Sequence, residues 1–415
     1  MFPCHCQRTF GSTAALMQHQ TAKRGVCIAA QPTRPPTQPK PSSPPSPPNL
    51  RRRSHEAKLF MSGLKPQPIA SFDPLTLTPS ETPVSSKTPP ELICSYNWQS
   101  DGGFHVPGHA AIYQPPPLPI TLPFDTPTPF LPKHTTPGTT TTTNPFEQAL
   151  DATAVMSPTF RFTDVDIVTT RNSLRKFLKF CKGSREPFRV NISLVEKTLF
   201  VEQFHVRAMV DRGWGRSFER FFARYPAGLE GSTSHDRFLR YGIGGVECVV
   251  GFEVDACYEG DDVDQVRSGL GELSIGRASG SGSGSLYGAR IMPQSSVAEL
   301  KTCKPGRNGM ATYLPQLWFG RTPWLITGAH VDGKFVKTTV VKVEEQFGAW
   351  EAEHQTELRK LAALLQQLRE AVRGSRVGKC AAVYERDGDE GALKVYKLSK
   401  QGQVVSDEVL QRFWG

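Results

Sequence analysis

The chain has 415 residues, with 49 Lys and Arg against 39 Asp and Glu, 36 Gly, 35 Pro and 9 Cys. This length allows one large domain or two of ordinary size. No run approaches the roughly 18 consecutive apolar residues of a transmembrane helix, which excludes that class. Because the first residues lack an apolar signal segment, we expect a protein that is not secreted, and its scattered cysteines then argue against a disulfide framework.

Composition and charge divide the chain into two unequal parts. Residues 32–145 contain 27 of the 35 prolines, so the apolar core must lie downstream. Up to residue 145 there are 12 basic and 6 acidic residues, and after it 37 basic and 33 acidic ones. A basic balance favours an anionic partner, with nucleic acid first, although it serves solubility equally well.

Three regions follow from this division. Residues 1–27 form a head that contains Cys and His, and residues 28–90 are a Pro- and Ser-rich linker that we expect to be disordered. Residues 91–415 have the patterns of an α+β domain with a mixed β-sheet core flanked by helices. Within that domain, the Gly- and Ser-rich residues 259–290 predict a mobile insert.

The head has the inner spacing of a C2H2 zinc finger, Cys6-x3-Phe10-x5-Leu16-x2-His19. Its outer positions depart from that pattern, because Cys4 lies too close to Cys6 and a cysteine replaces the last histidine. Thiolate and imidazole ligands suit Zn²⁺. The candidate zinc ligands are Cys4, Cys6, His19 and Cys27. The alternative is an unstructured tail with incidental cysteines.

The hydrophobic periodicity of the domain predicts its elements in chain order. Strands are expected from residue 91, at 188–194 and 197–204, at 247–257, at 295–303, at 323–330, at 334–343 and in two final segments, 381–387 and 392–398. Helices are expected over 162–181, 213–224, 308–320 and 346–373. The last helix has the spacing of a coiled-coil seam or of a helix packed on a sheet. The strands that follow it favour the packed helix.

Two of these strands carry the residues of a candidate active site. Side chains alternate along a strand, so Glu253 and Asp255 share one face, and Glu299 and Lys301 share one face. If the two strands are neighbours, three carboxylates and an ammonium converge. Such a cluster is stable only with cations, and its oxygen ligands select Mg²⁺ or Mn²⁺, which can catalyse phosphoryl transfer. Lys301 would position the attacking water or help to deprotonate it. The alternative is an ordinary solvated sheet face.

The segment before the first acidic strand is basic and aromatic. Arg237, Arg240 and Tyr241 could bind phosphates and stack on a base, because their strand leads into Glu253. A solvated strand edge with a half-buried tyrosine is the alternative.

The order of these motifs resembles the decapping exoribonuclease family of the PD-(D/E)xK nuclease superfamily. Residues 168–171 (VTTR) resemble its V-T-W-R block, 213–219 (GWGRSFE) its W-G-Y-K-F-E block, 253–255 its E-V-D block and 299–301 its E-L-K block. The resemblance spans 159–345, with weaker similarity to about residue 398.

This resemblance implies site residues and a function. It implies that Arg171 serves the substrate phosphates, that Glu219 completes the metal site of Glu253, Asp255 and Glu299, and that Gln316 lies on the helix that follows. It also implies hydrolysis at RNA 5′ ends by decapping, pyrophosphate release or 5′-to-3′ exonucleolysis. A 5′-to-3′ exoribonuclease as partner and a nuclear location follow from nuclear members of the family, with the cytoplasm as the other location.

Some positions depart from the family pattern. Thr170 stands where the family has Trp, Asn172 where it has Gly, and Arg216-Ser217 replaces a basic aromatic pair. We therefore expect altered substrate contacts around an intact metal site. These departures leave a second hypothesis, a catalytically weak or inactive scaffold of the same fold that binds nucleic acid or protein.

Overall fold

The computed structural model describes residues 58–126, 146–204, 213–260, 291–307, 309–375, 378–387 and 390–415, with residues 2–3, 9–12, 14–15 and 18 of the head. Contacts divide the chain into two units, residues 1–53 and 54–415. In the first, β1 (Phe2–Pro3) pairs with β2 (Thr9–Phe10). The four candidate zinc ligands and residues 261–290 of the predicted insert lie outside the described residues. No helix in the described ranges is long and apolar enough to cross a membrane.

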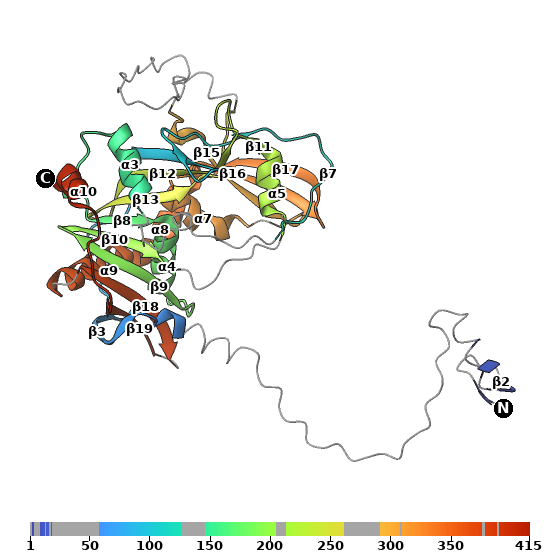
Figure 1. Cartoon of the computed structure of the whole chain (residues 1–415), viewed down its shortest axis with the longest axis horizontal. Coiled ribbons are helices and arrows are strands. Elements are labelled where there is room, and N and C mark those ends of the chain that lie inside the picture. The colour runs from blue at the N-terminus through green and yellow to red at the C-terminus, as the bar shows by residue number, and fades with distance from the viewer. Residues whose placement is uncertain are drawn as a thin grey trace. The chain divides into compact units, whose positions relative to one another are not determined.

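The second unit contains two mixed β-sheets (Figure 1). In the described residues, the larger sheet has ten strands in the order β3-β19-β18-β9-β10-β8-β13-β12-β4-β5. Its strands are β3 (Leu64–Phe72), β4 (Glu91–Gln99), β5 (Phe104–His105), β8 (Ile167–Thr170), β9 (Phe188–Val195), β10 (Thr198–Gln203), β12 (Ser232–Ile243), β13 (Val246–Glu253), β18 (Lys379–Asp387) and β19 (Glu390–Leu398). Because β8 pairs in parallel with both β10 and β13, whereas β12 and β13 are antiparallel, the sheet is mixed.

The smaller sheet has seven strands in the described residues, in the order β11-β6-β14-β15-β16-β17-β7. They are β6 (Ile112–Tyr113), β7 (Ile120–Thr121), β11 (Ala223–Arg224), β14 (Ala256–Cys257), β15 (Val297–Cys303), β16 (Trp324–Val331) and β17 (Lys334–Lys342). The chain passes from the larger to the smaller sheet between β13 and β14. The strand expected over 247–257 is therefore interrupted at residues 254–255, and this interruption places the acidic residues between the sheets.

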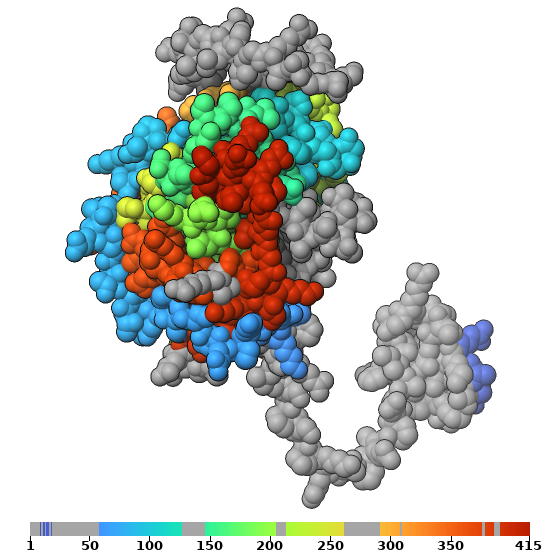
Figure 2. Space-filling view, turned by 60° about the vertical axis from the view of Figure 1, so that its left-hand side comes forward, coloured from blue at the N-terminus to red at the C-terminus, as the bar shows by residue number. Residues whose placement is uncertain are grey.

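Helices cover both sheets. They are α3 (Glu147–Met156), α4 (Arg171–Cys181), α5 (Gly215–Phe222), α7 (Met310–Phe319), α8 (Phe347–Glu353), α9 (Gln355–Gly374) and α10 (Asp407–Trp414), with 3-10 turns η1 (Phe162–Asp164), η2 (Gln294–Ser296) and η3 (Glu344–Gln346). Residues of α4, α7, α8 and α9 share one core with both sheets. Residues of α3 and α10 pack on other side chains of the larger sheet, and Figure 2 shows α10, in red, on that surface.

The helix expected over 162–181 is wrong in its first half. Residues 162–164 form η1 and residues 167–170 form the central strand β8, and only Arg171–Cys181 is helical. The run Ile167-Val168-Thr169-Thr170 is β-branched, which favours a strand and disfavours a helix. The helix starts where the Thr170 side chain accepts a hydrogen bond from the Ser173 amide, at 3.3 Å.

The helix expected over 346–373 is two helices, α8 and α9, that meet at His354. The apolar face of α9, including Leu358, Leu361 and Leu365, is fully buried in the core that the two sheets share. This packing corresponds to the helix-on-sheet alternative and leaves no free coiled-coil seam on these residues.

The disordered linker predicted over 28–90 extends too far. Residues 64–72 form β3, which pairs with β19 at the edge of the larger sheet. An edge strand tolerates Pro66 and Pro68, which lack an amide hydrogen, so a proline-rich composition did not prevent pairing. Farther on, Val84 is buried, and its amide donates to Gln355 of α9 at 3.1 Å. The linker prediction is therefore wrong for residues 58–90.

Candidate active site

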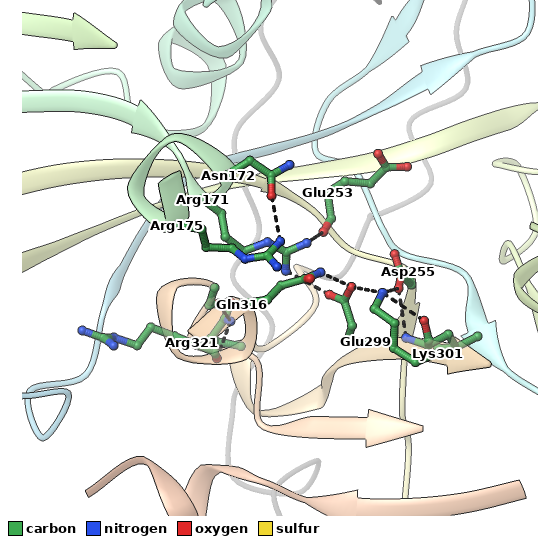
Figure 3. A network of polar contacts seen from close by, with 12 residues as sticks. Arg171, Asn172, Arg175, Glu253, Asp255, Glu299, Lys301, Gln316 and Arg321 are labelled. Atoms are coloured by element: carbon green, nitrogen blue, oxygen red, sulfur yellow. Dashed lines mark hydrogen bonds and ion pairs between the residues drawn. The ribbon is translucent and has the colours of Figure 1, made fainter. Parts of the chain in front are cut away.

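Glu219, Asp255 and Glu299 lie where the two sheets meet, and with Glu253 at the end of β13 they are called the acidic cluster. The Glu253 side chain is exposed and points away from Glu299 (Figure 3). The pairing of Ala256 with Ala298 brings the residue before β14 next to β15. Asp255 Oδ2 accepts a hydrogen bond from the Leu300 amide at 2.9 Å. The two acidic segments are therefore neighbours, as the sequence predicted, through the pairing of β14 with β15. The hydrogen bond from Leu300 holds Asp255 next to Glu299.

Glu299 is the centre of the polar network in Figure 3. Its side chain is 2% exposed. Arg171 Nη1 contacts Glu299 Oε2 at 2.9 Å, and Lys301 Nζ and Gln316 Nε2 both donate to Oε1. Arg171 comes from α4, Lys301 from β15 and Gln316 from α7. Arg171, which is 128 positions away in the sequence, therefore meets Lys301 and Gln316 at the Glu299 carboxylate.

The surrounding cations keep Glu299 ionised. Burial alone would raise its pKa, but the charges and hydrogen bonds of Arg171 and Lys301 lower the pKa of Glu299 to about 2. Burial opposes the charge of Lys301 as well, yet Glu299 and Asp255 together raise the pKa of Lys301 above its ordinary value. Lys301 Nζ also lies 3.5 Å from Asp255 Oδ2. The lysine is therefore a fixed ammonium between two carboxylates at neutral pH.

Asp255 and Glu219 differ from Glu299, because their pKa values are raised rather than lowered. Burial, and then the negative charge of Glu299, raise the pKa of Asp255 to about 7. Burial, and then Asp255, raise the pKa of Glu219 to about 9, with Glu253 and Glu299 adding to the rise. Lys301 opposes both shifts without overcoming them. These two carboxyl groups therefore bind protons more tightly than ordinary carboxyls, because Lys301 compensates their negative charge only in part.

The affinity of Asp255 and Glu219 for protons bears on whether the site fits a divalent cation, because a metal ion would take the place of those protons. In the described part of the chain, no three acidic, His or Cys side chains are already drawn together closely enough to hold a metal ion. Glu299 instead bonds to Arg171, Lys301 and Gln316. However, carboxylate oxygens are the ligands that Mg²⁺ and Mn²⁺ prefer, and a divalent cation bound between carboxylates neutralises their charge. The donor chemistry therefore fits a divalent cation.

Three features outside the acidic cluster position Arg171. It is the first residue of α4, directly after the Thr170 cap, and its guanidinium lies over the Phe252 ring at 5.3 Å. Gly320, which ends α7, leaves room for it, since a Cβ there would lie 3.2 Å from Arg171 Nη1. The Thr170 cap thus begins the helix that carries Arg171.

Arg237 and Arg240 lie outside this network. Arg237 is 1% exposed, and its Nη1 donates to the Met292 carbonyl at 2.9 Å. Arg240 lies 3.4 Å from a Glu247 carboxylate oxygen and 3.9 Å from one of Glu91. Tyr241 is buried too. Arg237 and Tyr241 pack in the interior on β12, which lies between β13 and β4, so the solvated strand edge expected as the alternative is wrong for them. Substrate contact by Arg240 stays a prediction.

Two residues that support the site were missed in the sequence analysis. Asp125 is buried and accepts hydrogen bonds from the amides of Arg216 and Ser217 at 3.1 and 2.8 Å, which caps α5, the helix of Glu219. Nothing in the local sequence links it to that helix. Arg175 lies one turn after Arg171 on α4. The four-residue spacing of Arg171 and Arg175, which places both on one face of a helix, could have identified it.

The fold is shared with solved structures of Rai1 proteins. Rai1 of S. pombe in complex with 3′-FADP is 14% identical, with a TM-score of 0.53 over 79% of this chain and 99% of that chain. Candida albicans Rai1 in complex with pU5-Mn²⁺ is 13% identical, with a TM-score of 0.53 over 85% and 99%. Scheffersomyces stipitis Rai1 in complex with (3′-NADP)⁺ and calcium ion is 13% identical, with a TM-score of 0.51 over 81% and 94%.

These similarities confirm the predicted α+β class at the level of the fold and define the chain as a Rai1-like fold with a buried acidic site. The chain belongs to the family described as Domain of unknown function (DUF8563), whose model matches residues 71–414. No curated protein sequence matches the chain.

Proposed function

We propose that the protein is a metal-dependent hydrolase that acts on RNA 5′ ends. The observation that carries this proposal is the meeting of Asp255, Glu299 and Lys301 with Arg171 and Gln316 in a fold shared with Rai1. Structures of that fold contain a 5′-phosphorylated oligouridine with Mn²⁺ and a nicotinamide dinucleotide with calcium ion, which supports nucleotide ends and divalent cations as ligands here.

The roles of the residues follow from their charges. Asp255 and Glu219, with Glu253 and Glu299, would hold Mg²⁺ or Mn²⁺, which supplies neutralisation of charge on the phosphate oxygens. Arg171, anchored by Glu299, is placed to donate hydrogen bonds to a phosphate. Gln316 keeps the Glu299 carboxylate oriented.

Lys301 is assigned a narrower role than the sequence alone allowed. Its raised pKa keeps the ammonium protonated at neutral pH, so it is a poor base for the attacking water. It can donate a hydrogen bond to that water and offset the negative charge that develops on the phosphate.

The test is hydrolysis by the purified full chain. We would incubate it with Mg²⁺ or Mn²⁺ and RNAs that carry a 5′-triphosphate, a cap, an NAD cap or a 5′-monophosphate. Release of the 5′ group or of nucleotides is expected from at least one RNA, and Asp255→Ala should abolish it. Near-normal hydrolysis by Asp255→Ala would refute this site. Glu345→Ala, which removes one exposed carboxylate, is the control.

One observation favours a second candidate, a scaffold that binds without turnover. Glu299 already has three protein partners, Arg171, Lys301 and Gln316, which stabilise the site without a metal. Under this alternative, the wild type binds RNA or Mn²⁺ and cleaves no RNA of the panel.

The head and the cellular setting are proposed from the sequence alone. We propose that Cys4, Cys6, His19 and Cys27 bind one Zn²⁺, and that the protein works in the nucleus with a 5′-to-3′ exoribonuclease. Zinc content that is unchanged in Cys27→Ser would refute the ligand set. Co-purification of the tagged full chain from nuclear extract, followed by mass spectrometry, tests the partner.

A further inference from the structure

A second arginine points toward the site beside Arg171. Arg175 follows it by four residues on α4, so the two side chains leave the same face of the helix, one turn apart. Figure 3 shows both guanidinium groups in the polar network, with Asn172 next to them. Arg175 is half-buried, and Glu299 is among the charges that act on it. The pair therefore brings two positive charges to one side of Glu299.

These two cations are unequally compensated. Arg171 pairs with Glu299 at 2.9 Å and donates to the Glu253 carbonyl at 3.4 Å. Arg175 donates to Asn172 Oδ1 at 3.2 Å and forms no ion pair with any carboxylate of the described residues. Burial, and then the charge of Arg171, lower the pKa of Arg175. A half-buried cation beside a second cation is unfavourable unless an anion joins them.

A second, independent observation points to the same ligand. Arg171 is 7% exposed, yet its buried Nε–H has no hydrogen-bond acceptor among the described residues. Buried donors of this kind normally have a partner, because a buried N–H without an acceptor has lost its hydrogen bond to water and gained none in return. Phosphoryl oxygens accept hydrogen bonds from guanidinium groups, often two at a time. An anion with several oxygens would satisfy Arg171 Nε and neutralise Arg175.

We propose that Arg171 and Arg175 together bind a second phosphoryl group of the substrate, adjacent to the one at the acidic cluster. The inference rests on the proposed function and specifies its substrate class: RNA 5′ ends with two or more linked phosphates, in preference to 5′-monophosphates. The charge of Arg171 is already partly neutralised by Glu299. Arg175 therefore provides the positive charge that distinguishes 5′ ends with linked phosphates from 5′-monophosphates. It acts as a specificity residue.

The first experiment measures binding without turnover. Inorganic pyrophosphate and inorganic phosphate are titrated by calorimetry into the full chain in metal-free buffer. Pyrophosphate should bind more tightly than phosphate, and Arg175→Ala should weaken pyrophosphate binding by at least about tenfold. Arg175→Lys, which keeps the charge without the planar fork, should be intermediate. Arg185→Ala, which removes an exposed arginine after the same helix, should bind as the wild type does.

The second experiment measures kcat/KM with Mn²⁺ on 5′-triphosphate and 5′-monophosphate RNAs of one sequence. Arg175→Ala should lower the value for the triphosphate by about 10- to 100-fold and that for the monophosphate by only a few-fold. Unfolding by Arg175→Ala would show in its melting curve, and Arg175→Lys then carries the test.

The two experiments separate the inference from the proposed function. If the wild type cleaves no RNA but Arg175→Ala loses pyrophosphate binding, the proposed function fails and the two-arginine site stands. If the wild type cleaves RNA and Arg175→Ala keeps both pyrophosphate binding and the triphosphate preference, the inference alone is overturned. A wild type that binds pyrophosphate no better than phosphate also overturns it.

Discussion

Two regions of the second unit, residues 54–415, hold acidic side chains with raised pKa values, and the regions differ in what surrounds those acids. At β9 and β10, no other acid of the described residues contributes to the pKa of Glu202: burial raises it to about 7, and the Asn191 amide and the Arg189 charge oppose that rise. Arg189 is itself held by the carbonyls of Phe60 and Ser62 at 2.9 and 2.7 Å. At the acidic cluster, burial also raises the pKa of Asp255 and Glu219, but neighbouring carboxylates raise it further.

The difference separates a structural acid from a cluster that requires a cation. A single buried carboxyl can avoid the cost of burial by taking up one proton. In the acidic cluster, Glu219, Asp255 and Glu299 act on one another's charge while Arg171 and Lys301 hold Glu299 ionised, so full ionisation of all three is unfavourable unless a cation joins them. Glu202 therefore contributes to folding alone, whereas the acidic cluster is suited to a divalent ion and a phosphate.

The largest expected effect is on hydrolysis. Asp255→Ala should lower kcat/KM on the preferred RNA by about 1000-fold or more, because it removes a carboxylate at the centre of the cluster. Glu202→Gln, which alters an equally buried acid, should stay within a few-fold of the wild type. Gel-based hydrolysis rates for both variants make this comparison. Equal losses in the two variants would break the distinction between the two regions.

A smaller effect concerns the pH dependence of stability at Glu202. Its folded-state pKa, about 7, lies above the ordinary value of a glutamate, so the folded state binds its proton more tightly than the unfolded state. Its contribution is therefore fully present below about pH 4 and is lost as the pH rises to about 7, with a total of up to about 3 kcal/mol.

Glu202→Gln should remove that slope, so the free energies of unfolding of wild type and variant, measured in urea from pH 5 to 8, should diverge with pH. Parallel curves would mean that Glu202 is solvated in the folded protein.

Metal binding should change the free energy of unfolding by a comparable amount. Mn²⁺ at 100 times its dissociation constant should stabilise the wild type by about 2.7 kcal/mol. Glu202→Gln should gain as much, whereas Asp255→Asn should gain little, because it loses one charged ligand. Thermal melts with and without Mn²⁺ measure the gain. An undiminished gain in Asp255→Asn would place the ion elsewhere on the protein.

The smallest expected effect on kcat/KM comes from displacing Arg171, one of the cations that contact Glu299. Gly320→Ala introduces a Cβ 3.2 Å from Arg171 Nη1 and 2.8 Å from Thr322 Oγ1, at a backbone φ of −82° that alanine adopts freely. Displacing Arg171 from Glu299 should lower kcat/KM by about tenfold, or about 1.4 kcal/mol. Gly348→Ala, whose Cβ would contact nothing, is the matched control. An active Gly320→Ala would show that Arg171 tolerates displacement.

Much of the fold and most of the site followed from local patterns. Period-two alternation predicted β13 and β15, and with β15 the shared face of Glu299 and Lys301. The face expected to be shared by Glu253 and Asp255 is wrong, because the strand is interrupted at residues 254–255, Glu253 is exposed and Asp255 contacts β15. The order of motifs added Arg171, Glu219 and Gln316. The pattern failed at residues 162–170, where a β-branched strand precedes a helix directly, and at residues 58–90, where proline content suggested disorder.

The sequence by itself determined which residues carry charge, which strands alternate and which residue types suit a divalent cation, because these depend on neighbours along the chain. Only the tertiary structure decided that Arg237 is buried while Arg171 reaches Glu299, and that Arg175 lies beside Arg171 without an ion pair to any acid in the described part of the chain. Burial and charge pairing depend on packing between α4, α7 and the two sheets, and these contacts join residues more than a hundred positions apart.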